Sequence, residues 1–158
     1  MKKNTAHIAR GGVIAAAYIL LTLLSAALGL SSGVIQVRIS EALCILPCYT
    51  GAAIPGLFIG CILANLLTGA NVIDIIFGSL ATLIGAAGTY IMRKHRYAAV
   101  LPPIVANTII IPLIFTYAYE IAGSYLYFAL TVFIGELISC GILGELLYSL
   151  LAKRKDLF

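Results

Sequence analysis

Residues 42–68 read ALCILPCYTGAAIPGLFIGCILANLLT, and this stretch decides how many helices the chain can form. It is uncharged and apolar, but Pro47, Gly51 and Pro55 interrupt it, and a proline in a helix interior breaks or kinks the helix. Its 27 residues would extend only about 40 Å as one helix. That is too short for two crossings of a hydrocarbon core about 30 Å thick. We therefore expect two helices here, of which the first, at about residues 41–49, is short or only partly embedded.

The rest of the chain is equally apolar and indicates a membrane protein. Of its 158 residues, 62% are hydrophobic and 10% are charged, and the mean hydropathy is +1.09. Soluble domains carry about 25% charged residues. Four further apolar blocks lie at residues 11–30, 72–92, 97–118 and 124–152. We interpret residues 1–158 as one integral membrane domain, because no room is left for a separate soluble domain.

The basic residues predict the topology. Nine of the ten lie in three clusters that flank apolar runs: Lys2, Lys3 and Arg10; Arg93, Lys94 and Arg96; Lys153, Arg154 and Lys155. Cytoplasmic loops carry an excess of lysine and arginine. Five spans would place the middle cluster outside, whereas six spans place all three clusters in the cytoplasm. The sequence therefore predicts an all-α membrane protein with six transmembrane helices and both termini cytoplasmic.

A few polar residues stand out because their surroundings are so apolar. Between residues 11 and 92 the only formal charges are those of Arg38, Glu41 and Asp74. A charge at the centre of a membrane helix costs about 2.5–3.5 kcal/mol on insertion scales, and such residues usually mark a ligand or ion site. Glu136 lies in the middle of the last apolar block with no basic residue within a turn. These charges predict a pocket that opens to the outside.

Two amides extend this predicted pocket. In the six-helix topology Asn65 lies near the outer leaflet, and Asn107 lies deeper, as Glu136 does. Membrane amides also hydrogen-bond neighbouring helices, which is their commoner use. We therefore keep both interpretations for Asn65 and Asn107.

The charged residues have structural interpretations as well. Arg38 and Glu41 suit a local ion pair, and Ser40 suits the N-cap of a helix that begins at Glu41. Asp74 follows a Gly-Ala-Asn turn and suits the positive end of a helix dipole. Glu145 lies near the cytoplasmic end, where it can snorkel or pair with Lys153.

Several chemistries have no support in the sequence. No glycine-rich phosphate loop with Lys-Ser or Lys-Thr is present, so no ATP site is predicted. His7 and His95 lie within basic clusters and form no metal motif with carboxylates. We expect the four cysteines to be small buried residues: Cys44, Cys48, Cys61 and Cys140. The sequence thus favours a binding or transport protein that is not an enzyme, has no cofactor and binds no nucleic acid.

The order of short motifs resembles the QueT family of queuosine-precursor transporters over about residues 10–150. The resemblance rests on Gln36-Val-Arg-Ile-Ser-Glu-Ala-Leu43 with Leu46-Pro47, Ala53-Ile-Pro-Gly-Leu-Phe-Ile-Gly60, Ala64-Asn65, Asp74-Ile-Ile-Phe-Gly-Ser-Leu-Ala-Thr-Leu83, Leu101-Pro-Pro103 with Asn107, and Gly135-Glu136-Leu137. The family is similar to the substrate-binding S subunits of energy-coupling factor (ECF) transporters. The resemblance implies the six-helix S-subunit fold in the cell membrane. It also implies a transmembrane coupling protein and two ATPases on other chains as partners.

The resemblance further implies a substrate and a docking face. The implied substrate is a 7-deazaguanine base, queuine or its aminomethyl precursor. The polar residues named above become its expected ligands: Gln36, Arg38, Glu41, Asn65, Asp74, Asn107 and Glu136. S subunits commonly dock through an Ala-x-x-x-Ala motif on the first helix. Here the corresponding small residues are Gly11, Gly12, Ala15 and Ala16, and the first of each pair is glycine.

Other functions stay open at this point. The alternatives within transport are an S subunit for another vitamin and a proton-coupled carrier that uses Glu136 as its relay. A membrane assembly factor or an enzyme without a small-molecule substrate is a different class, and it predicts no high-affinity ligand.

Overall fold

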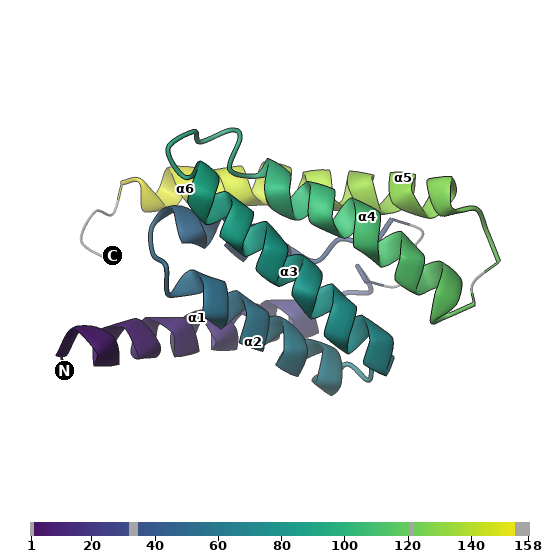
Figure 1. Cartoon of the computed structure of the whole chain (residues 1–158), viewed down its shortest axis with the longest axis horizontal. Coiled ribbons are helices and arrows are strands. Elements are labelled where there is room, and N and C mark those ends of the chain that lie inside the picture. Colours follow the sequence, from purple (N-terminus) through teal and green to yellow (C-terminus); the bar gives the residue numbers. More distant parts are fainter. Residues whose placement is uncertain (1, 32–34, 121, 154–158) are drawn as a thin grey trace.

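The computed structural model describes residues 2–31, 35–120 and 122–153, and every regular element in these ranges is a helix (Figure 1). In chain order they are α1 (Lys2–Ala27), η1 (Ile39–Cys48), α2 (Ala53–Leu67), α3 (Val72–Met92), α4 (Leu101–Tyr117), α5 (Tyr125–Glu136), η2 (Leu137–Leu143) and α6 (Gly144–Leu151). The last three run together as one rod over Tyr125–Leu151. The predicted all-α fold and the predicted number of helices are therefore confirmed.

The helices differ in length. Within the described residues, α1, α3 and the rod are the helices long and apolar enough to cross a membrane. The elements η1, α2 and α4 have 10, 15 and 17 residues and are shorter than the roughly 20 residues of an ordinary span. Six complete crossings and their orientation thus remain predictions.

The stretch at residues 42–68 divides as expected. Its first half belongs to η1, which begins at Ile39 and ends at Cys48, just after Pro47. The element is a 3₁₀-helix, whose rise of about 2.0 Å per residue makes it about 20 Å long. Its N-cap is Arg38, without a side-chain capping bond. The expected cap at Ser40 is wrong, because that hydroxyl is buried and accepts a hydrogen bond of 2.8 Å from Thr22 Oγ1.

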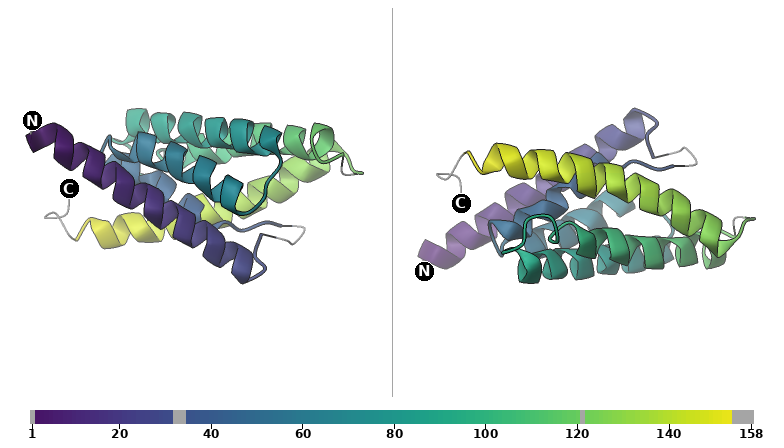
Figure 2. Two further views of the ribbon diagram at one scale, coloured as in Figure 1. Left: turned by 90° about the horizontal axis from the view of Figure 1, so that it is seen from below. Right: turned by 90° about the horizontal axis from the view of Figure 1, so that it is seen from above.

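The short helix η1 lies at the centre of the fold. It contacts α1, α2, α3, η2 and α6, while α2 packs between α1 and α3, and α4 packs between α3 and α5 (Figure 2). Glycines let α1 and α2 approach closely. A Cβ atom on Gly56 would lie 2.7 Å from Gly11 O, and one on Gly60 would lie 3.1 Å from Ala15 Cα. The buried core around this contact includes Tyr18 and Leu57.

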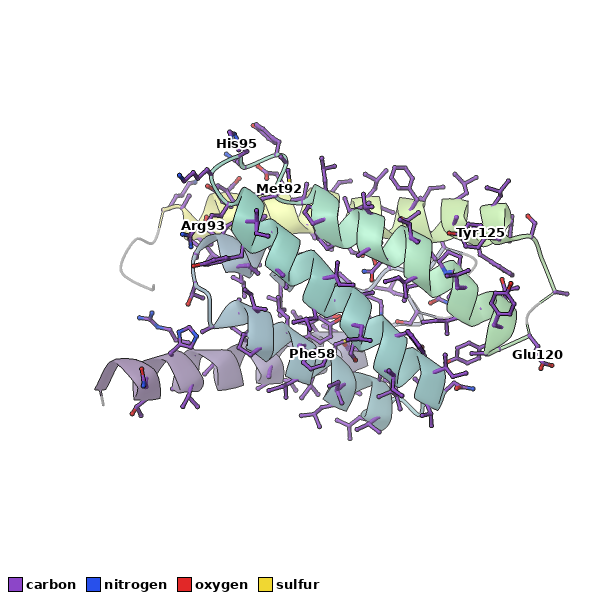
Figure 3. All side chains as sticks on the ribbon, in the orientation of Figure 1. Phe58, Met92, Arg93, His95, Glu120 and Tyr125 are labelled. Carbon is purple, nitrogen blue, oxygen red and sulfur yellow. The ribbon has the colours of Figure 1, made fainter. Side chains whose placement is uncertain are left out.

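The two ends of the molecule differ in character. The N-terminus, the α3–α4 loop and the end of α6 lie at one end (Figures 1 and 2). Figure 3 shows Arg93 and His95 at this end, and Glu120 and Tyr125 at the opposite end. This arrangement agrees with the positive-inside prediction for the clusters at the start of α1 and in the α3–α4 loop, and Lys153 follows the end of α6. Arg154 and Lys155 lie outside the described residues.

The α3–α4 loop is attached to α6 by an ion pair. The guanidinium of Arg96 pairs with Glu145 and donates a hydrogen bond of 2.6 Å to Ser149 Oγ. It also lies over the ring of Tyr148, 4.9 Å from its centroid. Glu145 therefore pairs with a loop residue, and the expected partner Lys153 is wrong.

Candidate ligand-binding pocket

A cavity of about 350 Å³ lies toward the end of the molecule opposite the start of α1 and the end of α6. Its wall includes the α2–α3 connection at residues 68–70 and Tyr119 beyond the end of α4. Six of the seven residues predicted to bind substrate line it: Gln36, Arg38, Glu41, Asp74, Asn107 and Glu136. They come from four helices and the segment before η1, so the fold brings together residues that are far apart in the sequence. The volume is at the lower end of the range for small-molecule sites.

Glu41 forms one deep part of the wall. It lies in the first turn of η1, and its side chain is 1% exposed. Its Oε1 accepts a hydrogen bond from the hydroxyl of Tyr18 on α1, and its Oε2 accepts one of 3.1 Å from Cys44 Sγ. A tyrosine on α1 and a cysteine on η1 thus supply two neutral donors to this carboxylate. A buried charged group requires such hydrogen bonds.

Glu136 forms a second deep part of the wall and is supported in the same way. It is the last residue of α5 and is 8% exposed. Its Oε1 accepts a hydrogen bond of 2.9 Å from Asn107 Nδ2 on α4, and its Oε2 accepts one of 3.2 Å from Cys140 Sγ. The π-helix η2 begins directly after it and carries Cys140. Single-turn π segments are frequent at functional sites.

The thiols therefore take part in the polar network. Cys140 Sγ also lies 3.3 Å from the main-chain oxygen of Glu41, which links the two carboxylate-bearing elements. Cys44, Cys61 and Cys140 are buried, as predicted, whereas Cys48 is only half-buried. Cys44 and Cys140 also donate to carboxylates, which the sequence did not predict.

The same residues contain one arrangement with metal-ligand spacing. Ligand atoms of Glu41, Cys44 and Cys140 lie within 4.8 Å of one another. Both thiols already donate to carboxylates, and neither lines the cavity. We therefore interpret this group as a hydrogen-bonded support for the pocket.

Arg38 lines the cavity and is hydrogen-bonded to an amide. Its Nη2 donates a hydrogen bond of 2.6 Å to Asn65 Oδ1. Among the described residues, no carboxylate oxygen lies within 4.0 Å of the guanidinium. The expected local ion pair between Arg38 and Glu41 is therefore wrong. Since a guanidinium carries five N–H donors, Arg38 retains donors for a ligand.

Asn65 lies behind Arg38. It is fully buried and is not part of the cavity wall. Besides accepting from Arg38, it contacts Asp74 O through Nδ2 at 3.5 Å. Asn65 thus supports Arg38 from behind the wall, and the predicted lining of the pocket by Asn65 is wrong. Its contacts agree with the alternative interpretation, in which membrane amides hydrogen-bond neighbouring helices.

Asp74 lies at the rim of the cavity, in the first turn of α3. The preceding Asn71 caps this helix by accepting a hydrogen bond from Ile73 N, 2.9 Å. Asp74 Oδ2 accepts a hydrogen bond of 3.2 Å from the hydroxyl of Tyr119. Its position agrees with the helix-dipole interpretation and also exposes the carboxylate to the cavity.

Two glycines shape the space beside these carboxylates. A Cβ atom on Gly135 would lie 2.2 Å from Gln36 O, so the main chain before η1 rests directly on α5 next to Glu136. A Cβ atom on Gly78 would lie 2.8 Å from Asp74 Oδ1. A side chain at either position would disturb the wall of the pocket.

Several residues of the wall were not predicted from the sequence. They include Thr68, Thr82, Phe115, Tyr119 and Thr131. Phe115 and Tyr119 are one helical turn apart, which is a weak signal for a shared face. Threonines in apolar helices usually bond to their own main chain, as Thr82 does with Gly78 O at 3.2 Å, so their sequence pattern gave no signal.

The predicted docking face on α1 is divided. Gly11 and Ala15 pack against α2 within this chain. Gly12 and Ala16 are exposed, and a Cβ atom on Gly12 would meet no atom within 4 Å. Of the four residues of the predicted face, Gly12 and Ala16 are therefore the two that are available to a partner protein.

Comparison with known proteins tests the resemblance inferred from the short motifs. The sequence model of the QueT transporter family matches residues 8–153. No curated protein and no solved structure matches the chain. The matched range covers nearly the whole chain and includes every polar residue of the cavity described above. The chain therefore belongs to the QueT transporter family.

Proposed function

We propose that this transporter is the membrane-embedded S subunit of an ECF-type importer and that it binds a 7-deazaguanine precursor of queuosine. The observation that carries the proposal is the composition of the cavity. It places two deep carboxylates, those of Glu41 and Glu136, and the guanidinium of Arg38 around a space of about 350 Å³ in an apolar bundle. Family membership supports the transport role.

The polar groups complement the edge of a deazaguanine base. Its ring N–H and exocyclic amine form a pair of donors, and its carbonyl oxygen is an adjacent acceptor. A carboxylate can accept two parallel hydrogen bonds from such a pair. We propose that Glu41 and Glu136 accept these hydrogen bonds. We propose that Arg38 donates a hydrogen bond to the carbonyl oxygen of the base. A buried site of this kind discriminates strongly against analogues that lack the donor groups.

An aromatic residue adds a surface for the planar base. Phe115 lines the cavity and is half-buried, and its ring packs edge-on against Phe128 with 5.8 Å between centroids. Stacking of a base on an aromatic ring contributes about 1–3 kcal/mol. We propose that Phe115 stacks on the base while the deep carboxylates hold its edge.

The proposed partners are a transmembrane coupling protein and two ATPases. The chain carries no phosphate-binding loop, so ATP hydrolysis would occur on other chains. Gly12 and Ala16 are exposed on α1 and are the proposed contact with the coupling protein. The charge distribution and the position of the start of α1 and the end of α6 agree with cytoplasmic ends and a pocket that opens outside.

A proton-coupled carrier is the second candidate. Its support is that the carboxylates of Glu41 and Glu136 are both buried and line the same cavity. Such groups occur in the proton relays of transporters. A carrier would accumulate substrate alone, whereas an S subunit would require its partners.

Calorimetry and uptake test the proposal together. We expect queuine and its aminomethyl precursor to bind the purified protein in detergent, and unrelated vitamins not to compete. We expect vesicles to take up the ligand only when the coupling protein, both ATPases and ATP are present. Absence of binding to both bases would overturn the substrate assignment. Uptake by the chain alone, driven by a proton gradient, would establish the carrier instead.

A further inference from the structure

We propose that Asp74 and Tyr119 form a cation subsite at the rim of the cavity, which binds the positively charged amine on the side chain of the ligand. The protein then selects aminomethyl-substituted 7-deazaguanines over neutral ones. This inference rests on the proposed function and adds the determinant of its specificity. It names a chemical feature of the ligand, an ammonium group on carbon 7, and the residues that recognise it.

The charge balance of the cavity supports a cationic ligand. Three carboxylates, those of Glu41, Asp74 and Glu136, line it together with the single guanidinium of Arg38. None of these four groups forms an ion pair within the described part of the chain. Buried charges are ordinarily paired, because removing them from water is costly. A ligand that carries a positive charge would reduce the excess of negative charge, whereas a neutral ligand would leave it.

The three carboxylates are not equally available. Both oxygens of Glu41 accept hydrogen bonds from protein donors, and so do both oxygens of Glu136. In the described residues, the Asp74 carboxylate accepts only from Tyr119, through Oδ2. Its Oδ1 faces Gly78, which has no side chain to cover it. Asp74 therefore has the largest unused capacity for an ammonium group, which carries up to three donors.

The position of Asp74 agrees with the geometry of the base. Carbon 7 lies on the five-membered ring, on the side of the bicycle away from the ring N–H and exocyclic amine. If the deep carboxylates hold that donor edge, the substituent on carbon 7 points toward the rim. Asp74 and Tyr119 lie at the rim, near the α2–α3 connection and the end of α4.

Aromatic rings surround the same position. Tyr119 and Phe115 both line the cavity, with their ring centroids 6.3 Å apart. An ammonium group near the face of such a ring is attracted by its quadrupole. The hydroxyl of Tyr119 also lies 3.1 Å from Asn71 N, at the start of α3. The subsite thus lies between α3, which carries the carboxylate, and the end of α4, near which the aromatic rings lie.

The test compares three ligands that differ only at carbon 7. Calorimetry on the full-length protein uses 7-aminomethyl-, 7-cyano- and unsubstituted 7-deazaguanine. The expected result is that the aminomethyl base binds at least about tenfold more tightly than either neutral base, the size of one charge-assisted hydrogen bond. Asp74→Asn keeps the size of the side chain and removes its charge. It should abolish this preference, with less than about a threefold change for the neutral bases.

Control variants separate recognition from structure. Glu120→Gln removes an exposed charge at the same end of the molecule and should leave all three affinities unchanged. Tyr119→Phe removes the hydroxyl bond to Asp74 but keeps the ring, so it should weaken the aminomethyl base less than Asp74→Asn does. Should Asp74→Asn not fold, the ratio of affinities in the wild-type protein decides.

The outcomes distinguish this inference from the proposed function. If the wild-type protein binds the aminomethyl and cyano bases equally well, the cation subsite is wrong and the proposed function stands. If Asp74→Asn weakens all three bases equally, Asp74 is a structural residue and the subsite is again wrong. If no deazaguanine binds, the proposed function fails and the subsite fails with it.

Discussion

Asn107 and Glu136, which are 29 residues apart in the sequence, share a hydrogen bond of 2.9 Å between α4 and α5. The donor is an amide and the acceptor a buried carboxylate, and both side chains line the cavity. The amide holds the carboxylate in place without neutralising its charge. Glu136 can therefore remain both buried and available to a ligand.

Glu136→Gln should weaken deazaguanine binding by at least about tenfold. The variant keeps the volume, but it replaces an acceptor with a donor that faces the donors of Asn107 and of the ligand. Loss of a charge-assisted hydrogen bond costs about 1.5–3 kcal/mol, and 1.4 kcal/mol is a factor of about ten. Calorimetry on purified protein measures the effect. If Glu41→Gln and Glu136→Gln both bind like the wild type while folded, these carboxylates have only a structural role.

Tyr18→Phe should lower stability without changing the shape of the core. Tyr18 is fully buried, and its hydroxyl is one of the two donors to Glu41. A buried polar group that loses its partner costs about 1–3 kcal/mol. Thermal unfolding in detergent should show a lower midpoint than that of Tyr117→Phe, a matched change at a residue that is 77% exposed. Equal midpoints would contradict a role for this hydroxyl in supporting the carboxylate.

Gly135→Ala should impair both stability and ligand binding. The added methyl group would lie 2.2 Å from Gln36 O and would displace the segment that covers Glu136. Overpacking of this kind typically costs about 1–3 kcal/mol. Gly141→Ala in η2 is the matched control, because its new Cβ atom would meet only Leu137 Cδ2, at 3.8 Å. Calorimetry and thermal unfolding of the two variants should differ clearly, and equal behaviour would mean that the contact with Gln36 is not tight.

Gly12→Leu combined with Ala16→Leu should abolish uptake while ligand binding persists. Both residues are exposed on α1, away from the cavity, so the larger side chains would disturb only a partner that packs there. Val105→Leu with Ile109→Leu is the control on an exposed face of α4. ATP-dependent uptake in vesicles that contain the partner subunits gives the measurement. Normal uptake by the double variant would place the docking face elsewhere.

Cysteine labelling should place the two ends of the molecule on opposite sides of the membrane. In a variant without the four native cysteines, we expect an impermeant thiol reagent to label Glu120→Cys from outside intact cells. Lys94→Cys should react only after the membrane is opened, because the basic α3–α4 loop is predicted to be cytoplasmic. Labelling at Lys94→Cys from outside would overturn the six-span topology.

The sequence predicted those features that depend on local chemistry. Pro47 lies next to the end of η1, as expected of a residue that breaks or kinks a helix, and the short buried helix follows from the length of the block. Glu41, Asp74 and Glu136 were identified because charge is costly in an apolar chain. All three line the same cavity.

Features that depend on contacts between distant elements were not predicted. Tyr18 resembles any aromatic residue of a membrane helix, and only the fold places its hydroxyl on Glu41. The contact of Cys140 Sγ with the main-chain oxygen of Glu41 likewise depends on the packing of η1 against η2. Arg38 was expected to pair with its neighbour in sequence, but α2 offers it Asn65 instead.

The π-helical segment η2 has a consequence for the whole rod Tyr125–Leu151. An α-helix advances about 100° per residue, since it has 3.6 residues per turn, and a π segment changes that angular phase. The cavity-facing Glu136 lies at one side of η2, and Glu145, which holds the α3–α4 loop through Arg96, lies at the other. Removing one residue from η2 would rotate one group by about 100° relative to the other. The length of this short segment thus sets the direction in which each end of the rod presents its carboxylate.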